Sequence, residues 1–223
     1  PEGWSRVLDR YGKTPEEIER LLAAGLIIRK DDGRHYDRFR ERLMFPIRDS
    51  RGRTIGFGGR TLGDGEPKYL NSPETVLFHN GRELYGLYEA RQALRDIERL
   101  FVVEGYMDVV GLARHGIDFV VGTLGTATTP EHHNRLVRMT DNVDFCFDGD
   151  RAGRKPDWRA LETALPLVLE WRQVRFTFHP DNQDPNSYVN EHGENALVES
   201  LDSGVRMAYF LINELDAQVE LEI

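Results

Sequence analysis

The chain has 223 residues, 39% of them apolar, which is enough to build one large core or two smaller ones and argues against disorder. No run approaches the roughly 20 apolar residues that a membrane span requires, and the first residues do not resemble a signal peptide. We therefore expect a soluble cytoplasmic protein without a membrane partner. The single cysteine, Cys146, lies in an apolar run and is predicted to be buried, so neither a disulfide framework nor a zinc site is expected.

The net charge of -9 is distributed unevenly along the chain. Residues 1–95 carry 18 Lys and Arg against 15 Asp and Glu, whereas residues 96–223 carry 11 against 23. Within the first part, residues 29–60 hold ten basic and five acidic side chains, so a polyanion would be attracted there first. Taken alone, this charge pattern indicates only a solvated surface, and nucleic-acid binding needs other evidence.

The first part of the chain is predicted to combine a helix with a small β-rich lobe. Thr14 and Glu17 form a capping-box pattern that opens a helix. Residues 43–47 and 54–57 flank a cluster of turn residues, which predicts two antiparallel strands. The polar stretch 63–73 has few apolar anchors, and we expect it to be an ordered loop.

From residue 83 onward, short apolar runs alternate with amphipathic segments, a pattern that predicts an α/β fold with a compact parallel sheet flanked by helices. The expected strands are 100–103, 117–121, 143–147 and 174–178, and the expected helices are 84–97, 107–115, 130–139 and 158–169. The tail, residues 194–223, is predicted to be helical.

Three of the four predicted strands are followed by acidic residues, at the edge where open parallel sheets bind ligands. These residues are Glu104 and Asp108, Asp148 and Asp150, and Asp184. Carboxylates at close range repel one another unless a cation neutralises them, and an all-oxygen set favours Mg²⁺, with Mn²⁺ as a substitute. Two such ions can stabilise both oxygens of a phosphoryl transfer. The alternative is that each acid only caps a helix, but their repeated placement favours a metal site.

Phosphatases of the haloacid-dehalogenase type also place an Asp-x-Asp pair after a strand, and they are the first alternative. In those enzymes the first Asp is a nucleophile near the start of the domain. Here Glu104 comes earlier on a preceding strand, and Gly153 follows the Asp pair closely. Both features favour a different class of acidic sheet.

Two motifs, Glu104-Gly-Tyr-Met-Asp108 and Asp148-Gly-Asp-Arg-Ala-Gly153, resemble the Toprim signature of bacterial DnaG-type primases. Segments 56–60, 67–75 and 84–87 also resemble primase segments that other Toprim enzymes lack. The similarity extends over most of residues 43–193.

The resemblance implies an RNA polymerase domain that copies a single-stranded DNA template from ribonucleoside triphosphates into a short RNA primer at the replication fork. Its domains would be a partial, basic amino-terminal lobe (1–82), a Toprim catalytic domain (83–193) and the start of a helical subdomain (194–223). The zinc-binding module and the domain that binds the replicative helicase are expected to be absent from this chain.

The resemblance also implies roles for individual residues. Glu104, Asp148 and Asp150 would be catalytic and would bind metal together with Asp108 and Asp184, and Glu104 could assist deprotonation. Contacts with nucleotide or template would come from Arg60, Lys68 and Asn71, and Tyr69 could stack on a base.

Two positions depart from the family pattern. Asn80 stands where primases often carry a lysine, which leaves one phosphate or template contact in doubt. Asn186 stands where an aspartate is usual, so we expect weaker metal binding at that position.

Several other residues are weaker candidates. We expect His132 and His133 to face solvent on a helix, without a metal role. Arg38, Arg40 and Arg42 alternate with other residues and could line one strand face toward DNA or form exposed ion pairs. Phe78 could stack on a base, although an isolated aromatic residue is more often part of a core.

Two further functions remain open. A Toprim nuclease or topoisomerase would cleave instead of join at the same metals, although a topoisomerase needs a tyrosine nucleophile in a further domain. A non-catalytic module that binds single-stranded DNA would be favoured if metal binding proved absent.

Overall fold

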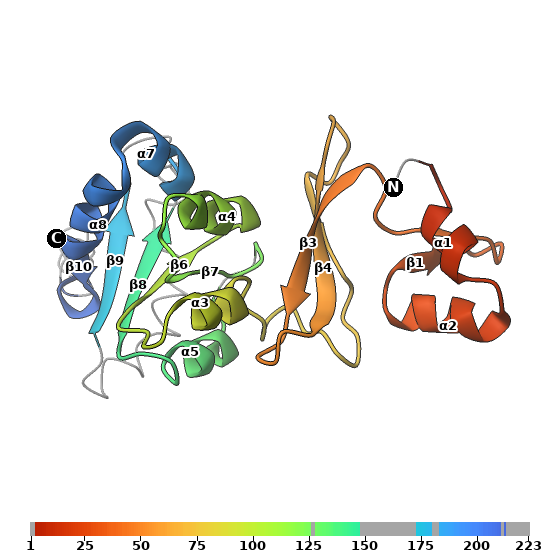
Figure 1. Ribbon diagram of the computed structural model, residues 1–223, viewed down its shortest axis with the longest axis horizontal. Helices are drawn as coiled ribbons and strands as arrows, with labels where there is room; N and C mark the ends of the chain where they lie inside the picture. The colour runs from red at the N-terminus through yellow and green to blue at the C-terminus, as the bar shows by residue number, and fades with distance from the viewer. Residues whose placement is uncertain (1–2, 126–127, 148–172, 180–182, 211, 213–223) are drawn as a thin grey trace, which may run out of the picture. The chain divides into compact units, whose positions relative to one another are not determined.

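A computed structural model describes residues 3–125, 128–147, 173–179, 183–210 and 212. The chain divides into two compact units, Pro1–Glu83 and Leu84–Ile223, which we call the first and the second unit (Figure 1). None of the helices in the described ranges is long and apolar enough to cross a membrane.

The first unit begins with two helices and a two-stranded sheet: α1 (Arg6–Tyr11), α2 (Pro15–Ala23), β1 (Ile27–Arg29) and β2 (His35–Asp37). The predicted capping box is confirmed, because Thr14 Oγ1 accepts from Glu17 N at 3.2 Å and Glu17 Oε2 accepts from Thr14 N at 3.1 Å. Asp37 is completely buried, and its carboxylate accepts from Val7 N and Leu8 N at 2.8 and 3.1 Å. This carboxylate thereby joins the start of α1 to β2.

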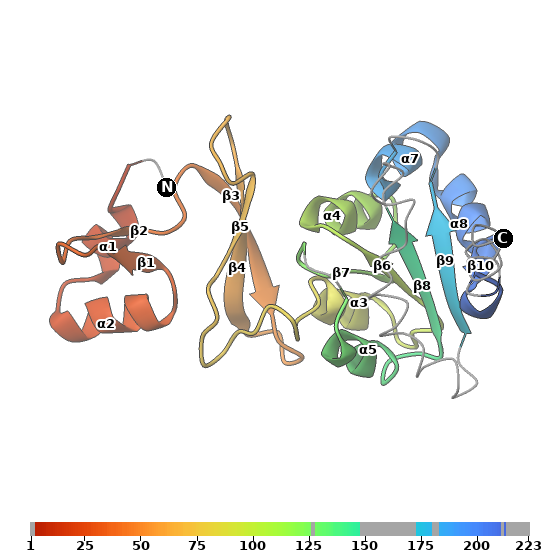
Figure 2. The ribbon, with the colours of Figure 1, turned by 180° about the vertical axis from the view of Figure 1, so that it is seen from behind.

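An antiparallel sheet of β3 (Arg42–Arg48), β4 (Thr54–Thr61) and β5 (Tyr69–Asn71) completes the first unit (Figure 2). The predicted hairpin is therefore confirmed, with longer strands than expected. The stretch 63–73 is not entirely loop, because β5 pairs with Gly58–Arg60 of β4. Three residues are too few to give a period-2 signal in the sequence. Phe78 is completely buried against Gly56, so it belongs to the core and cannot stack on a base.

The second unit is built on a five-stranded sheet in the order β10-β9-β8-β6-β7. Four strands are parallel, as predicted, and β10 pairs with β9 in the antiparallel direction. The strands are β6 (Leu100–Val103), β7 (Val120–Gly122), β8 (Asn142–Phe147), β9 (Gln173–Phe178) and β10 (Val205–Arg206), and the helices are α3 (Leu87–Ala93), α4 (Tyr106–Arg114), α5 (Pro130–Leu136), α7 (Pro185–His192) and α8 (Glu194–Asp202). The predicted α/β class is confirmed, while the predicted helix 158–169 lies outside the described residues.

Two apolar clusters pack on opposite faces of this sheet, as the alternation of side chains along a strand requires. Val102 and Phe145 lie in the cluster that also contains Leu136 of α5. Phe101 and Cys146 lie in the cluster that contains residues of α4, α7 and α8. Cys146 is buried, as predicted.

The described part of the tail differs from the helical subdomain that the sequence suggested. Leu197 and Leu201 of α8 pack in the same core as β6, and β10 extends the sheet beside β9. Residues 194–210 are thus structurally part of the second unit. A strand of two residues carries no recognisable pattern in the sequence, so β10 could not be predicted.

His132 and His133 are buried on α5, which corrects the expectation that they face solvent. The ring of His133 stacks on Phe145, with centroids 5.6 Å apart. His132 Nδ1 accepts a hydrogen bond from Thr129 N at 3.3 Å, as the third residue of a capping motif. Histidine is polar in sequence patterns, but a neutral imidazole packs well on an aromatic ring, so the local sequence did not indicate this burial.

A buried carboxylate connects three neighbouring elements of the sheet. Asp144 on β8 is completely buried and accepts from Arg99 Nε at 2.8 Å and from Arg175 Nη1 of β9 at 3.4 Å. Arg99 precedes β6 and also donates to Asp202 at the end of α8 at 2.8 Å. Although burial alone would lower the pKa of Arg99, the hydrogen bond and charge of Asp144 raise it. The guanidinium therefore stays charged in the folded protein.

We expect Asp144→Ala to lower the free energy of unfolding by about 3 kcal/mol, because the change leaves two partly buried guanidinium groups without their shared carboxylate. Urea denaturation with an unchanged m-value measures this loss. Asp202→Ala is the matched control: its side chain is 64% exposed, so its loss should stay below about 1 kcal/mol. If both variants lost the same free energy of unfolding, the burial of Asp144 would not explain its contribution to stability.

Burial lowers the pKa of His133 to about 4, with a smaller contribution from His132. An unfolded histidine titrates near 6.5, so the stability that the neutral imidazole contributes is present above about pH 6.5 and is lost as the pH falls toward 4. In His133→Phe, which keeps an aromatic ring against Phe145, the slope of unfolding free energy against pH should decrease by up to about 1.4 kcal/mol per pH unit in this window. Urea titrations at pH 4.5 to 7.5 test it, and an unchanged slope would contradict the assignment.

Candidate metal and nucleic-acid sites

The carboxyl ends of β6, β8 and β9 meet at one edge of the sheet in the second unit. Val102 of β6 pairs with Phe145 of β8, and Phe147 of β8 pairs with Phe178 of β9. Glu104 follows β6 directly and is exposed at this edge, where its backbone carbonyl accepts from Gly125 N at 3.0 Å. Asp148 and Asp150 follow the end of β8 in the sequence and lie outside the described residues.

Asp108 and Asp184 lie at the amino-terminal ends of the two helices that start at this edge. Asp108 lies in the first turn of α4, where its Oδ2 accepts from Gly105 N at 3.2 Å. Asp184 is the N-cap of α7, and its Oδ1 accepts from Ser187 N at 2.6 Å. Both acids therefore cap helices, and their predicted role as metal ligands stays a prediction. Capping does not exclude metal binding, because a carboxylate that accepts a hydrogen bond can also coordinate a cation.

The donor chemistry of this edge fits a hard divalent cation. Glu104, Asp108 and Asp184 offer carboxylate oxygens, and the two remaining predicted ligands are also aspartates. Among the residues in the described ranges, no three His, Cys, Asp or Glu side chains stand together closely enough to hold a metal ion. The predicted ligand set thus depends on Asp148 and Asp150.

The structure gathers the predicted nucleotide-binding residues on β4, on β5 and at the end of the connection between them, in the first unit. Arg60 pairs with Tyr69 across the two strands, and Lys68 Nζ lies 6.0 Å from the centre of the Tyr69 ring. Arg60 and Lys68 line a polar pocket of about 470 Å³ formed by the connection between the strands. Asn71 Nδ2 donates to Asn80 Oδ1 at 3.3 Å, so the departure at Asn80 lies beside a predicted contact residue.

A second group of aromatic and basic side chains was predicted only in part, since Arg40 was a candidate for contact with DNA but its three partners were not. Trp4 is 63% exposed, and its ring lies 6.0 Å from that of Tyr36. The guanidinium of Arg40 lies 4.1 Å from the Trp4 ring and 4.9 Å from the Tyr36 ring, and Lys30 Nζ lies within 5.6 Å of both. We call these four residues the aromatic platform. Lys30, Tyr36 and Arg40 fall within eleven residues, whereas Trp4 is distant in the sequence and no local pattern predicts that it meets them.

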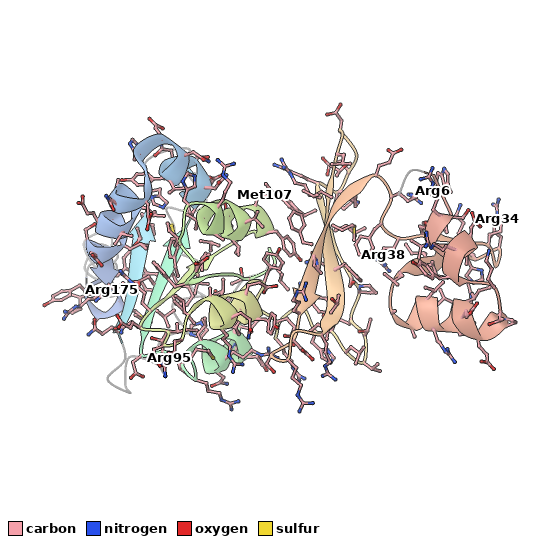
Figure 3. All side chains as sticks on the ribbon, viewed as in Figure 1. Arg6, Arg34, Arg38, Arg95, Met107 and Arg175 are labelled. Carbon is pink, nitrogen blue, oxygen red and sulfur yellow. The ribbon has the colours of Figure 1, made fainter. Side chains whose placement is uncertain are left out.

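Arg38, Arg40 and Arg42 do not share one strand face, contrary to one of the two expectations for them. Only Arg42 lies on a strand, β3, where it donates to the carbonyls of Gly59 and Lys68 at 3.1 and 3.3 Å. Between the arginines, Glu41 has a φ of +49°, which interrupts extended backbone. Figure 3 shows the side chain of Arg38 among those of the first unit, and burial lowers its pKa.

Comparisons with known proteins agree with these features. Residues 1–91 match the family described as "DNA primase catalytic core, N-terminal domain", and residues 101–189 match the Toprim-like family. The chain is 56% identical to the DNA primase of Escherichia coli K12 over 221 residues, which are 99% of this chain and 38% of that protein. It therefore spans well under half of the curated relative.

Two solved structures extend the comparison. The E. coli primase catalytic core matches with a TM-score of 0.93 and 56% identity, over 98% of this chain and 70% of that one. A DnaG primase catalytic domain bound to single-stranded DNA matches with a TM-score of 0.93 and 55% identity, over 98% of this chain and 68% of that one. The motifs at the carboxyl edge, the fold of both units and these likenesses agree: the chain belongs to the DnaG family of bacterial DNA primases.

Proposed function

We propose that this chain is the catalytic core of a DNA primase, a DNA-directed RNA polymerase that makes short RNA primers by nucleotidyl transfer. The observation that carries the proposal is the likeness to DnaG catalytic cores over 98% of the chain. Its other proposed partners are ribonucleoside triphosphates, the RNA product and, through a domain outside this chain, the replicative helicase. The proposed place of action is the bacterial cytoplasm.

Glu104, Asp148 and Asp150 are proposed to hold Mg²⁺ together with Asp108 and Asp184, with Mn²⁺ as a substitute. When bound, the cations supply neutralisation of the charge that develops on the transferred phosphoryl group. Glu104 is exposed at the carboxyl edge, and we assign it a further role in accepting the proton of the primer 3′-hydroxyl. The positive ends of α4 and α7 face the same edge and favour an anionic substrate there.

Arg60, Lys68, Tyr69 and Asn71 are proposed to contact the template or the nucleotide, and the aromatic platform provides a second contact surface. Two neighbouring aromatic rings with adjacent cations suit single-stranded DNA, because every base has a π-face and every nucleotide a phosphate. The nuclease, topoisomerase and non-catalytic alternatives lack comparable support, since residues 1–91 match a family described as the N-terminal domain of the DNA primase catalytic core.

The chain should synthesise RNA on a single-stranded DNA template when ribonucleotides and Mg²⁺ are supplied. Asp148→Asn should reduce the rate by at least about a hundredfold, because one negative charge is lost where transition-state charge is stabilised. Labelled products on a denaturing gel measure the rate.

The matched control is Asp118→Asn, an exposed acid just before β7 and so at the opposite end of the strands. It should retain the parent rate. If the parent makes no RNA under these conditions, or if both variants match the parent, the proposed function is wrong for this chain.

Arg60→Ala and Lys68→Ala should weaken binding of an oligothymidylate, because each variant neutralises fewer phosphates. The slope of log affinity against log salt concentration should fall by about 0.7 for each phosphate that the protein no longer neutralises. Fluorescence anisotropy at several salt concentrations gives the slope. Arg34→Ala is the matched control, because Arg34 is 76% exposed in the same unit and pairs with Asp32 at 2.7 Å. A slope that falls equally in all three variants would reflect net charge alone and remove Arg60 and Lys68 from the DNA path.

A further inference from the structure

Helices α4 and α7 pack against each other on one face of the sheet (Figures 1 and 2), and Gly111 lies at their contact. A glycine inside a helix lowers stability by roughly 0.5–1 kcal/mol relative to alanine, so its presence here calls for a packing reason. The reason is the side chain of Asn186, the second residue of α7. A Cβ added to Gly111 would lie 2.5 Å from Cγ of Asn186 and 3.1 Å from its Cβ, and closer still to its Oδ1.

The amide of Asn186 is held in this position from its own helix. Asn190 Nδ2 donates to the Asn186 carbonyl at 2.7 Å and to its Oδ1 at 3.2 Å. The Oδ1 of Asn190 in turn lies 3.0 Å from His115 Nε2, at the end of α4. Turning the amide away would lose the bond from Asn190 and would leave the Cβ of Asn186 against α4. The contact between Asn186 and Gly111 therefore determines how closely the two helices approach each other.

This contact lies within about one helical turn of two of the proposed metal ligands. Asp108 precedes Gly111 by three residues on α4, and Asp184 precedes Asn186 by two residues as the N-cap of α7. Because each carboxylate is hydrogen-bonded to the first turn of its own helix, it moves with that helix. A displacement of α7 on α4 thus changes the position of Asp184 relative to Asp108 and Glu104.

We propose that Asn186 is a positioning residue, whose contact with Gly111 sets the spacing between the carboxylate of Asp108 on α4 and that of Asp184 at the start of α7. This inference rests on the proposed function, because it concerns the same metal ligands. The sequence suggested that Asn186 is a weak metal ligand. The inference gives its amide a packing role instead, in which it holds two helices at a fixed distance.

The experiment measures Mn²⁺ binding by isothermal titration calorimetry, and thermal unfolding in parallel, for the parent, Gly111→Ala, Asn186→Ala and the double variant. Gly111→Ala should weaken Mn²⁺ binding by about tenfold, as loss of a group that orients a ligand commonly does. Asn186→Ala adds no atoms and should weaken it by less, about threefold. The double variant should bind Mn²⁺ nearly as well as Asn186→Ala, because the two shortest contacts of the added methyl group, with the amide, are removed and only the 3.1 Å contact with the Cβ of residue 186 remains.

Val110→Ala is the control, since Val110 adjoins Gly111 on α4 but is 42% exposed and lines a pocket with Glu89 and Ala90 of α3, so Mn²⁺ affinity should stay within about twofold of the parent. Parent affinity in Gly111→Ala, or additive losses in the double variant, would overturn the inference while leaving the proposed function intact. If Gly111→Ala does not fold, recovery of folding in the double variant supports the contact between Asn186 and Gly111. Failure of the double variant to fold overturns the inference. A parent that binds no Mn²⁺ overturns the proposed metal site itself and the inference with it.

Discussion

The buried carboxylate of Asp144 is the interaction on which the second unit depends. It lies inside β8, between a guanidinium that precedes β6 and another on β9, so a single charge ties together three parallel neighbours. Parallel strands whose core faces are uniformly apolar have little else in their side chains to fix their alignment, because one Val or Phe can replace another along the strand. The ionic contact therefore favours one register, and that register brings the carboxyl ends of the strands level.

Acidic residues in this chain serve both the fold and the proposed chemistry. Asp37 and Asp144 are completely buried and work structurally, whereas Glu104 is exposed at the edge of the sheet. Asp108 and Asp184 stand between these classes, because they cap helices at the edge where a metal is proposed. A cap fixes the direction of a carboxylate through a backbone N–H group, and a fixed direction favours metal binding. The two roles are thus compatible in one residue.

Much of the fold could be predicted from the sequence, because strong periodic signals determined it. The strand 100–103 was predicted with the bounds of β6, and the capping box at Thr14 marked the start of α2. The short strands β5 and β10 could not be predicted, because they form only through pairing with a longer neighbour. The burial of His132 and His133 depends on Phe145 and other distant residues, which the polarity of the local sequence cannot reveal.

The candidate sites divide in the same way. The acids could be found from their places after apolar runs, since a strand end is a local property of the sequence. The aromatic platform could not be found, because Trp4, Lys30, Tyr36 and Arg40 meet only through the pairing of β1 with β2 and the chain that follows. The contact between Asn186 and Gly111 could not be predicted from the sequence either, because it depends on how two helices cross.

The uneven charge of the chain gains a physical meaning from these sites. A nucleic-acid polymerase must attract a polyanion and also hold carboxylates for cations, and these demands conflict on one surface. In this chain the basic and aromatic groups belong to the first unit, and the carboxylates of the strand ends belong to the second. Phosphate would be repelled by the acidic edge unless cations neutralised it, so the proposed binding of DNA and the proposed reaction at metals can depend on different residues. A net charge of -9 is therefore compatible with the proposed binding of nucleic acid.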